Sequence, residues 1–135
     1  MKKIGNYEVL KKTGEGGMAS VYKGRQVSLN RPVAIKVLSE KLTENKEIVE
    51  RFNREALIIA RLTHSNIIHV IDRGVVNGRY YFVMGFVEGT DLSSIIKKGN
   101  YDTNKKIDVI IQVCKAPLLL IKTELFTGIL NQRIF

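Results

Sequence analysis

Residues 13–21 read Thr13–Gly14–Glu15–Gly16–Gly17–Met18–Ala19–Ser20–Val21, and this glycine-rich stretch decides how the rest of the chain is interpreted. Glycine has no Cβ, so its backbone amide can approach a bulky anion closely and can adopt a positive φ. A turn built from such residues can present N–H groups to phosphate oxygens. The pattern alone leaves two interpretations open: a phosphate-binding turn, or a glycine-rich hairpin that binds nothing.

The stretch lies between two predicted strands, which makes it the tip of a hairpin. Residues 7–12 alternate apolar and polar side chains, as a half-buried strand does, and residues 20–25 form the second strand. A turn at residues 29–32 leads to a third predicted strand, residues 33–38, which is short, apolar and rich in β-branched side chains.

Lys36 is the charged residue of this third strand. Side chains alternate along a strand, so Lys36 shares a face with Ala34 and Leu38 and is expected to be half-buried. An ammonium group in such a place needs a partner. The alternative is a lysine that points to solvent.

Residues 43–62 supply a candidate partner for this lysine. Apolar side chains recur there at helical spacing, and Glu55 lies on the apolar stripe. Because a carboxylate on a buried helix face is costly unless it is paired, we predict an ion pair between Lys36 and Glu55. The alternative is a surface pairing of Glu55 with Arg51 or Arg54.

The remaining segments complete an α+β pattern. Asn77–Gly78 is a strong signal for a hairpin turn. The sequence predicts strands at residues 67–72 and 80–84, a connector at 85–89, a short helix at 91–96 capped by Thr90 or Asp91, and a longer helix from Thr103 or Asn104.

The composition limits the classes of function. The net charge is +9, but Lys and Arg are scattered without an interleaved aromatic platform, so we expect no nucleic-acid partner. We find no secretory signal and no run approaching the roughly 18 apolar residues that a membrane span needs. The single cysteine, Cys114, fits a reducing compartment, and we expect a cytoplasmic protein. His64 and His69 lack a nearby cysteine or carboxylate cluster, so we expect no metal site.

Three motifs together resemble the N-terminal lobe of protein kinases. They are Gly14-x-Gly16-x-x-Ala19-x-Val21, the strand Val33–Ala34–Ile35–Lys36, and Glu55 within Arg51–Phe52–Asn53–Arg54–Glu55–Ala56. The Arg-Phe-x-Arg-Glu run is most similar to bacterial serine/threonine kinases, and the resemblance covers roughly residues 7–115. It implies an α+β fold with a five-stranded antiparallel sheet and one large helix in residues 7–88, followed by the first helices of a helical lobe in residues 89–115.

The resemblance also implies an ATP site, with Mg²⁺ as the metal that the family uses. The amides of residues 15–19 would cover the phosphates, Lys36 would hold the α- and β-phosphates, and Glu55 would orient Lys36. Val21 and Ala34 would sandwich the adenine. Met84 would lie at the back of the pocket, and the backbones of Gly85 and Val87 would hydrogen-bond the base. The implied ATP-binding residues are Thr13, Gly14, Glu15, Gly16, Gly17, Met18, Ala19, Val21, Ala34, Lys36, Glu55, Met84, Gly85 and Val87. A protein substrate, and a homodimer formed through the N-terminal lobe, are the other implied partners.

Four residues depart from the family's usual pattern. Thr13 stands where isoleucine or leucine is usual, Ala19 replaces a third glycine, and Gly85 replaces a glutamate. Ser65 replaces the proline of a His-Pro-Asn sequence. We expect these changes to affect nucleotide affinity more than the fold.

Residues 116–135 do not continue the family's pattern. They contain no His-Arg-Asp loop and no Mg²⁺-binding asparagine or aspartate of the family. With permitted codons for residues 120–135, however, a frame that starts at the last base of the Leu120 codon reads His-Lys-Asn-Gly-Ile-Ile-His-Arg-Asp-Ile-Lys-Pro-Ala-Asn-Ile, which is the family's catalytic loop. We therefore expect a one-base frame displacement between Lys115 and Ile121. The alternative is a diverged tail with a helix at residues 118–125.

Three functional hypotheses follow. The parent gene encodes a serine/threonine protein kinase, but this chain lacks the catalytic aspartate and is expected to be inactive. In the second hypothesis, the chain acts as an isolated nucleotide-binding or interaction module. In the third, it is an unstable product with an exposed apolar helix face.

Overall fold

The computed structural model describes residues 3–97, 99 and 102–122, with side chains up to residue 115. The chain divides into two compact units. The first comprises Met1–Arg61 and Ile68–Phe86, and the second comprises Leu62–Ile67 and Val87–Phe135. The predicted domain boundaries at residues 88 and 115 stay predictions.

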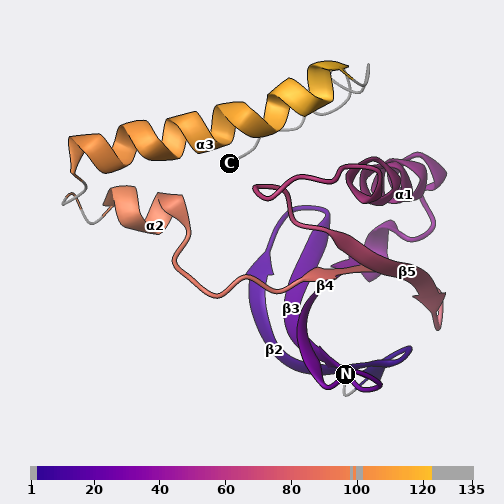
Figure 1. The fold of residues 1–135 in the computed structure, drawn as a ribbon. Helices are drawn as coiled ribbons and strands as arrows, with labels where there is room; N and C mark the ends of the chain where they lie inside the picture. The colour runs from indigo at the N-terminus through magenta and orange to yellow at the C-terminus, as the bar shows by residue number, and fades with distance from the viewer. Residues whose placement is uncertain (1–2, 98, 100–101, 123–135) are drawn as a thin grey trace. The chain divides into compact units, whose positions relative to one another are not determined.

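The first unit is built on a curled antiparallel sheet, which Figure 1 shows wrapping round on itself. Within the described residues the sheet has six strands in the order β1-β2-β3-β4-β6-β5. The predicted α+β fold is confirmed, and the sheet has one strand more than the predicted five. That strand, β1, has only two residues, too few to show an alternating pattern. The strands are β1 (Lys3–Ile4), β2 (Tyr7–Glu15), β3 (Ala19–Gln26), β4 (Arg31–Leu38), β5 (Val70–Val76) and β6 (Arg79–Gly85).

The β5–β6 hairpin turns at Asn77–Gly78, as predicted. Both residues have a positive φ, 51° and 74°, which is the requirement of a two-residue turn that matches the twist of its strands. The predicted strand at 67–72 begins later, at Val70, and runs on to Val76 because β6 pairs with it along its whole length.

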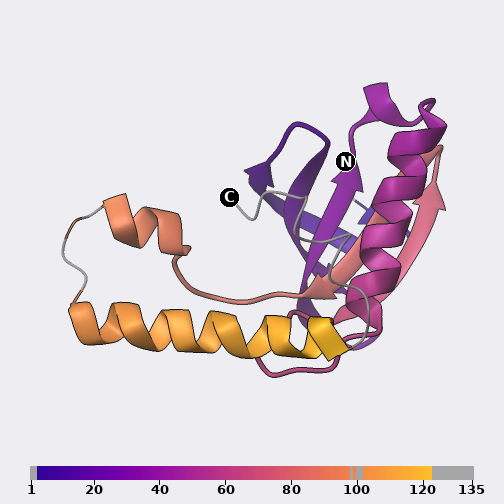
Figure 2. The same ribbon diagram turned by 90° about the horizontal axis from the view of Figure 1, so that it is seen from above.

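One large helix, α1 (Lys46–Ala60), packs against the sheet (Figure 2). It begins later than the predicted residue 43 because Glu40–Leu42 form a short 3₁₀ helix first. The Asn45 side chain then caps α1 by accepting a hydrogen bond from the Ile48 N–H, at 3.2 Å. Phe52 on α1 lies against Phe82 on β6, with 5.0 Å between ring centroids. These contacts form a core cluster of Ala19, Leu38, Phe52, Ala56, Val70 and Phe82.

A second core cluster fills the other face of the sheet, inside its curl. Its members are Ile4, Tyr7, Val33, Ile35, Val37, Tyr81 and Val83. Tyr7 on β2 donates a hydrogen bond from its hydroxyl to Asp72 Oδ2 on β5, at 2.8 Å. Since β2 and β5 are not neighbours in the sheet, this bond ties two distant parts of the sheet together. Gly74 leaves room for the Tyr81 hydroxyl, which would lie 2.7 Å from a Cβ there.

We expect Tyr7→Phe to lower the free energy of unfolding by about 1 kcal/mol near pH 8, because a partly buried hydrogen bond is lost. Burial, and then the bond to Asp72, raise the pKa of Tyr7 to about 12. The protonated phenol therefore stabilises the fold below pH 10, the unfolded value, and this contribution is lost as the pH rises towards 12. Urea titrations at pH 8 and pH 11 should show the difference between wild type and variant shrinking at the higher pH. A difference that grows with pH would contradict the assignment.

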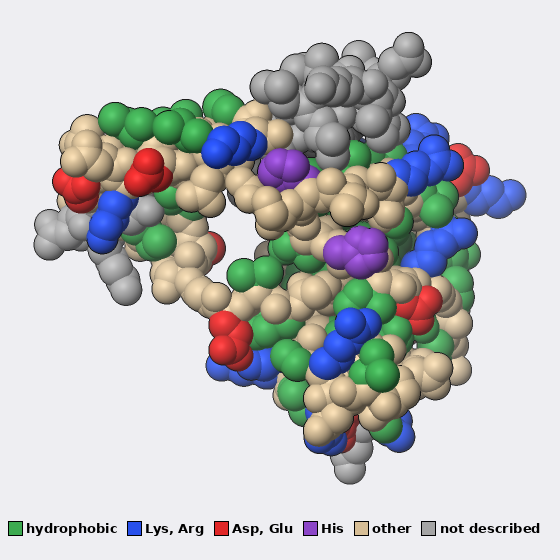
Figure 3. All heavy atoms as spheres, in the orientation of Figure 1, with side chains coloured by type: hydrophobic (Ala, Val, Ile, Leu, Met, Phe, Trp, Pro, Cys, Tyr) green, Lys and Arg blue, Asp and Glu red, His purple; other side chains and the backbone are tan. Residues whose placement is uncertain are grey.

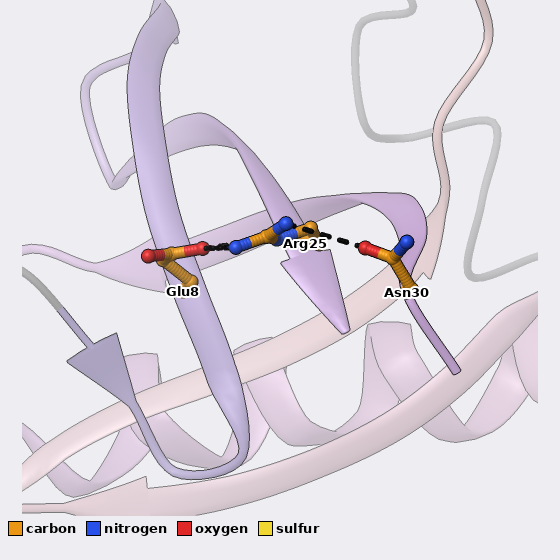
Figure 4. Close-up of polar contacts among 3 residues, drawn as sticks. All are labelled: Glu8, Arg25 and Asn30. Carbon is orange, nitrogen blue, oxygen red and sulfur yellow. Dashed lines mark hydrogen bonds and ion pairs between the residues drawn. The ribbon is translucent and has the colours of Figure 1, made fainter. Parts of the chain in front are cut away.

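Arg25 links three consecutive parts of the sheet (Figure 4). Its guanidinium donates to Glu8 Oε2 on β2 through Nε at 3.0 Å and Nη2 at 2.6 Å. Nη1 donates to Asn30 Oδ1 at 3.2 Å, in the turn before β4, where Asn30 has a φ of 49°. The groups are largely exposed, so we expect this network to contribute no more than about 1 kcal/mol.

The described part of the second unit contains two helices, α2 (Leu92–Lys97) and α3 (Thr103–Lys122). Asp91 caps α2, because its carboxylate accepts hydrogen bonds from the Ser94 hydroxyl and N–H at 2.6 and 2.8 Å. These bonds lower the pKa of Asp91. None of the helices among the described residues has both the length and the apolar character that a membrane span requires. Only the backbone of residues 116–122 is described, and the rest of the predicted out-of-frame tail, residues 123–135, lies outside the described residues.

Candidate functional site

The glycine-rich stretch forms the tip of the β2–β3 hairpin, as predicted. The Gly16 N–H donates to the Ala19 carbonyl at 2.9 Å and closes the turn, while the Met18 carbonyl accepts a hydrogen bond from the Ser39 N–H at 2.9 Å. A Cβ at Gly17 would meet nothing within 4 Å, and one at Gly16 would make only an ordinary contact at 3.6 Å. Neither glycine is among the residues with positive φ. The fold therefore does not itself require glycine at these two positions.

Strand register places four predicted site residues on one face of the sheet. Val21 on β3 lies opposite Lys36 on β4, and Ala34 on β4 lies opposite Met84 on β6. Directly opposite residues share a face, and residues two apart on a strand do so too. The side chains of Val21, Ala34, Lys36 and Met84 thus form one continuous patch next to the glycine-rich tip.

The predicted ion pair between Lys36 and Glu55 is confirmed. Lys36 Nζ donates to Glu55 Oε1, and the two side chains are only 21% and 19% exposed. Glu55 comes from α1, three residues after Phe52, and the buried Phe52 fixes the rotation of the helix that aims Glu55 at the sheet. Glu55 pairs with Lys36 and not with Arg51 or Arg54, which was the alternative.

The Lys36 ammonium can contact a further acceptor. It has three N–H donors, and Glu55 accepts one of them. The ring of Phe82 lies beside it, with 5.3 Å between Nζ and the ring centroid. Phe82 was not predicted as a site residue, although its position opposite Lys36 follows once β4 and β6 are paired.

The end of β6 provides the remaining predicted residues. The Gly85 N–H donates to the His69 carbonyl at 3.1 Å, so this N–H is already used within the protein. The Lys23 ammonium lies over the ring of Phe86, 4.4 Å from its centroid, a contact that no sequence pattern indicated. Val87 is 68% exposed and belongs to the second unit, so its contact with a base stays a prediction.

Charged side chains elsewhere on the first unit do not gather in one patch on the face that Figure 3 shows; Lys and Arg lie at several separate places among apolar and acidic side chains. Among the described residues, no group of three or more His, Cys, Asp or Glu side chains is arranged to hold a metal ion. We therefore assign no ligand for the family's Mg²⁺ among these residues.

Comparison with known proteins identifies the family. A family model described as "Protein kinase domain" matches residues 7–121. The chain belongs to the protein kinase family. Its relatives include a Clostridium perfringens protein named "Probable serine/threonine-protein kinase CPE1738", which is 46% identical over 117 residues, a match that covers 85% of this chain and 17% of the relative. Serine/threonine-protein kinase PrkC of Bacillus subtilis is 36% identical over 113 residues, covering 83% of this chain and 17% of PrkC.

Solved structures give the same result for this kinase-family chain. The kinase domain of Mycobacterium tuberculosis PknI superposes with a TM-score of 0.70 at 27% identity, covering 84% of this chain and 47% of the PknI chain. The chain therefore corresponds to about a sixth of the full length of the curated kinases named above and about half of a kinase domain. It is a serine/threonine kinase domain fragment.

Proposed function

We propose that this chain binds ATP through its first unit, as the nucleotide-binding part of a serine/threonine protein kinase. The observation that carries the proposal is the Lys36–Glu55 ion pair on the same sheet face as Val21 and Ala34, next to the glycine-rich tip. Lys36 would hold the α- and β-phosphates, Glu55 would keep its ammonium in place, and the apolar residues of the patch would contact adenine. The remaining first-unit residues of the proposed site are Thr13, Gly14, Glu15, Gly16, Gly17, Met18, Ala19, Met84 and Gly85.

The glycines of the tip support this proposal. The hairpin has space for a Cβ at Gly16 and Gly17, so internal packing does not explain the absence of side chains there. A bulky ligand that must approach the backbone amides does explain it, because a Cβ would hold phosphate oxygens away from the N–H groups.

Isothermal titration calorimetry with ATP tests the proposal. We expect Lys36→Met to weaken ATP binding roughly tenfold to a hundredfold, because a hydrogen-bonded charge opposite the phosphates is removed. Glu55→Gln should weaken it less, since the lysine stays. Lys41→Met, which removes an exposed lysine of the same unit, is the matched control and should bind ATP as the wild type does. Equal binding by Lys36→Met and wild type would refute the site.

We also propose that a protein of these 135 residues does not transfer the γ-phosphoryl group. The sequence contains no His-Arg-Asp aspartate to orient a substrate hydroxyl, and none of the family's Mg²⁺ ligands. A phosphorylation assay with radiolabelled ATP and a generic acceptor protein should therefore give no signal above a Lys36→Met background. Signal that depends on Lys36 would overturn this.

The reading-frame hypothesis extends the proposal to residues 116–135. A one-base displacement between Lys115 and Ile121 would turn a full kinase gene into one that encodes this chain. Sequencing the gene through this region decides the point: a neighbouring frame without the His-Arg-Asp loop would exclude the displacement.

A second reading, an unstable product, is favoured by one observation. Ile107, Ile110 and Ile111 on α3 are each about half exposed, which is unusual for three large apolar residues on one helix. A cooperative thermal transition followed by circular dichroism would argue against this reading.

We also propose that the protein is cytoplasmic and that it forms a homodimer through the first unit. Sedimentation of the purified chain would test the dimer.

A further inference from the structure

The two strands of the glycine-rich hairpin differ in how extensively they pair with other strands of the sheet. β3 pairs with β4 along its whole length, from Ala19 opposite Leu38 to Gln26 opposite Arg31. β2 pairs with β1 only near its beginning, at Tyr7 and Glu8. Among the strands that the structure describes, the half of β2 that leads to the tip therefore has β3 as its only neighbour. The path of this half of β2 therefore depends on the interactions that hold it to β3.

The pairing of β2 with β3 is irregular just before the tip. Lys12 lies opposite Tyr22 and Gly14 lies opposite Val21, so Thr13 is an extra residue with no partner of its own on β3. This is a β-bulge, which bends a strand and redirects the residues that follow. Only Gly14 and Glu15 separate Thr13 from the tip, so the bend sets where the amides of the tip lie.

The Thr13 side chain fastens this bulge. Its hydroxyl donates a hydrogen bond to the Val21 carbonyl on β3, at 3.3 Å. An isoleucine or leucine at this position could not make such a bond, because neither has a hydrogen-bond donor in its side chain. The pairing of β2 has a second irregularity at Leu10. The Leu10 side chain is apolar and 56% exposed, and it cannot donate a hydrogen bond to β3.

We propose that Thr13 is a positioning residue whose hydroxyl locks the bulge and thereby aims the glycine-rich tip at the phosphates of the nucleotide. This inference rests on the proposed ATP site and gives Thr13, one of its residues, a role that acts through the backbone of the hairpin. The hydroxyl matters for the phosphate end of the ligand and not for the base, because it controls the direction of the strand beyond Thr13.

The experiment compares Thr13→Val, which has the same shape without the donor, with Thr13→Ser, which keeps the donor, in the full chain. Thr13 is exposed and valine suits a strand, so we expect both variants to fold with melting temperatures close to the wild type. By calorimetry, Thr13→Val should bind ATP roughly threefold to tenfold more weakly, the range for one hydrogen bond. Adenosine binding should change by less than about twofold, and Thr13→Ser should restore ATP binding.

Amide hydrogen exchange without nucleotide gives a second, independent readout. The Gly16 N–H, bonded to the Ala19 carbonyl, should exchange faster in Thr13→Val than in the wild type or in Thr13→Ser. Unchanged exchange of the Gly16 N–H in Thr13→Val would overturn the proposed lock, regardless of the result of the ATP-binding measurement. Equal losses for ATP and adenosine would overturn the selective effect on the phosphates. Absence of ATP binding by the wild type, together with faster Gly16 exchange in Thr13→Val, would refute the ATP site and leave the lock standing.

Discussion

Replacing Phe52 with alanine is expected to lower the free energy of unfolding of the first unit by about 3–5 kcal/mol. The Phe52 side chain is only 1% exposed and packs against Phe82, at the centre of the cluster that joins α1 to the sheet. Its removal leaves a cavity that the rigid sheet cannot close. Because single domains are stable by only about 5–15 kcal/mol, this change removes a large share of the total.

The same substitution should also weaken the Lys36–Glu55 ion pair. Glu55 follows Phe52 by less than one turn, so a looser α1 no longer holds the carboxylate against Lys36. Urea unfolding followed by circular dichroism measures the stability, and ATP calorimetry at low temperature measures the site. Leu57→Ala is the matched control on the same helix: Leu57 is 43% exposed, and we expect a loss below about 1 kcal/mol. Equal losses for the two variants would show that Phe52 does not anchor the helix.

Replacing Gly24 with alanine is the second change with a large expected effect, about 3 kcal/mol of destabilisation. A Cβ there would lie 2.6 Å from Ile35 Cδ1 and 2.7 Å from the Glu8 carbonyl oxygen. Ile35 is fully buried, so its side chain has no free space to move into. The Glu8 oxygen belongs to the backbone of the neighbouring strand, so only a shift of β2 away from β3 could relieve the contact.

The control for this prediction is Gly85→Ala, another glycine within a strand. A Cβ at Gly85 would meet nothing within 4 Å, and its φ is not positive, so we expect a stability change within about 0.5 kcal/mol. Thermal unfolding of both variants, followed by far-ultraviolet circular dichroism, gives the comparison. A Gly24→Ala variant as stable as Gly85→Ala would mean that β2 and β3 are not packed as closely as the structure has them.

The centre of the candidate site could be predicted from sequence because it rests on short-range patterns. Lys36 is conspicuous in an apolar strand and Glu55 on an apolar helix stripe, and each charge is too costly to leave unpaired. The hairpin at Asn77–Gly78 is equally local, since the turn requires the positive φ that these residues tolerate.

Other features depend on how the sheet curls, and no sequence window contains that information. The Tyr7–Asp72 hydrogen bond joins residues 65 positions apart, and Lys23 meets Phe86 only once β4 and β6 lie side by side. The predicted start of α1 at residue 43 is wrong for a different reason. Thr43 and Asn45 are both good capping residues, and the short 3₁₀ helix at Glu40–Leu42 decides between them.

The strand order has a consequence for the growing polypeptide on the ribosome. β6 lies between β4 and β5, although it is the last of the three to be synthesised. Until residues 79–85 have left the exit tunnel, β4 exposes an unpaired apolar edge, which is a site for pairing with other nascent chains. Mispairing of the nascent chain is therefore expected mainly between the emergence of β4 and that of β6. All six strands and α1 end before residue 116, so a change of frame at that point would leave their residues unchanged.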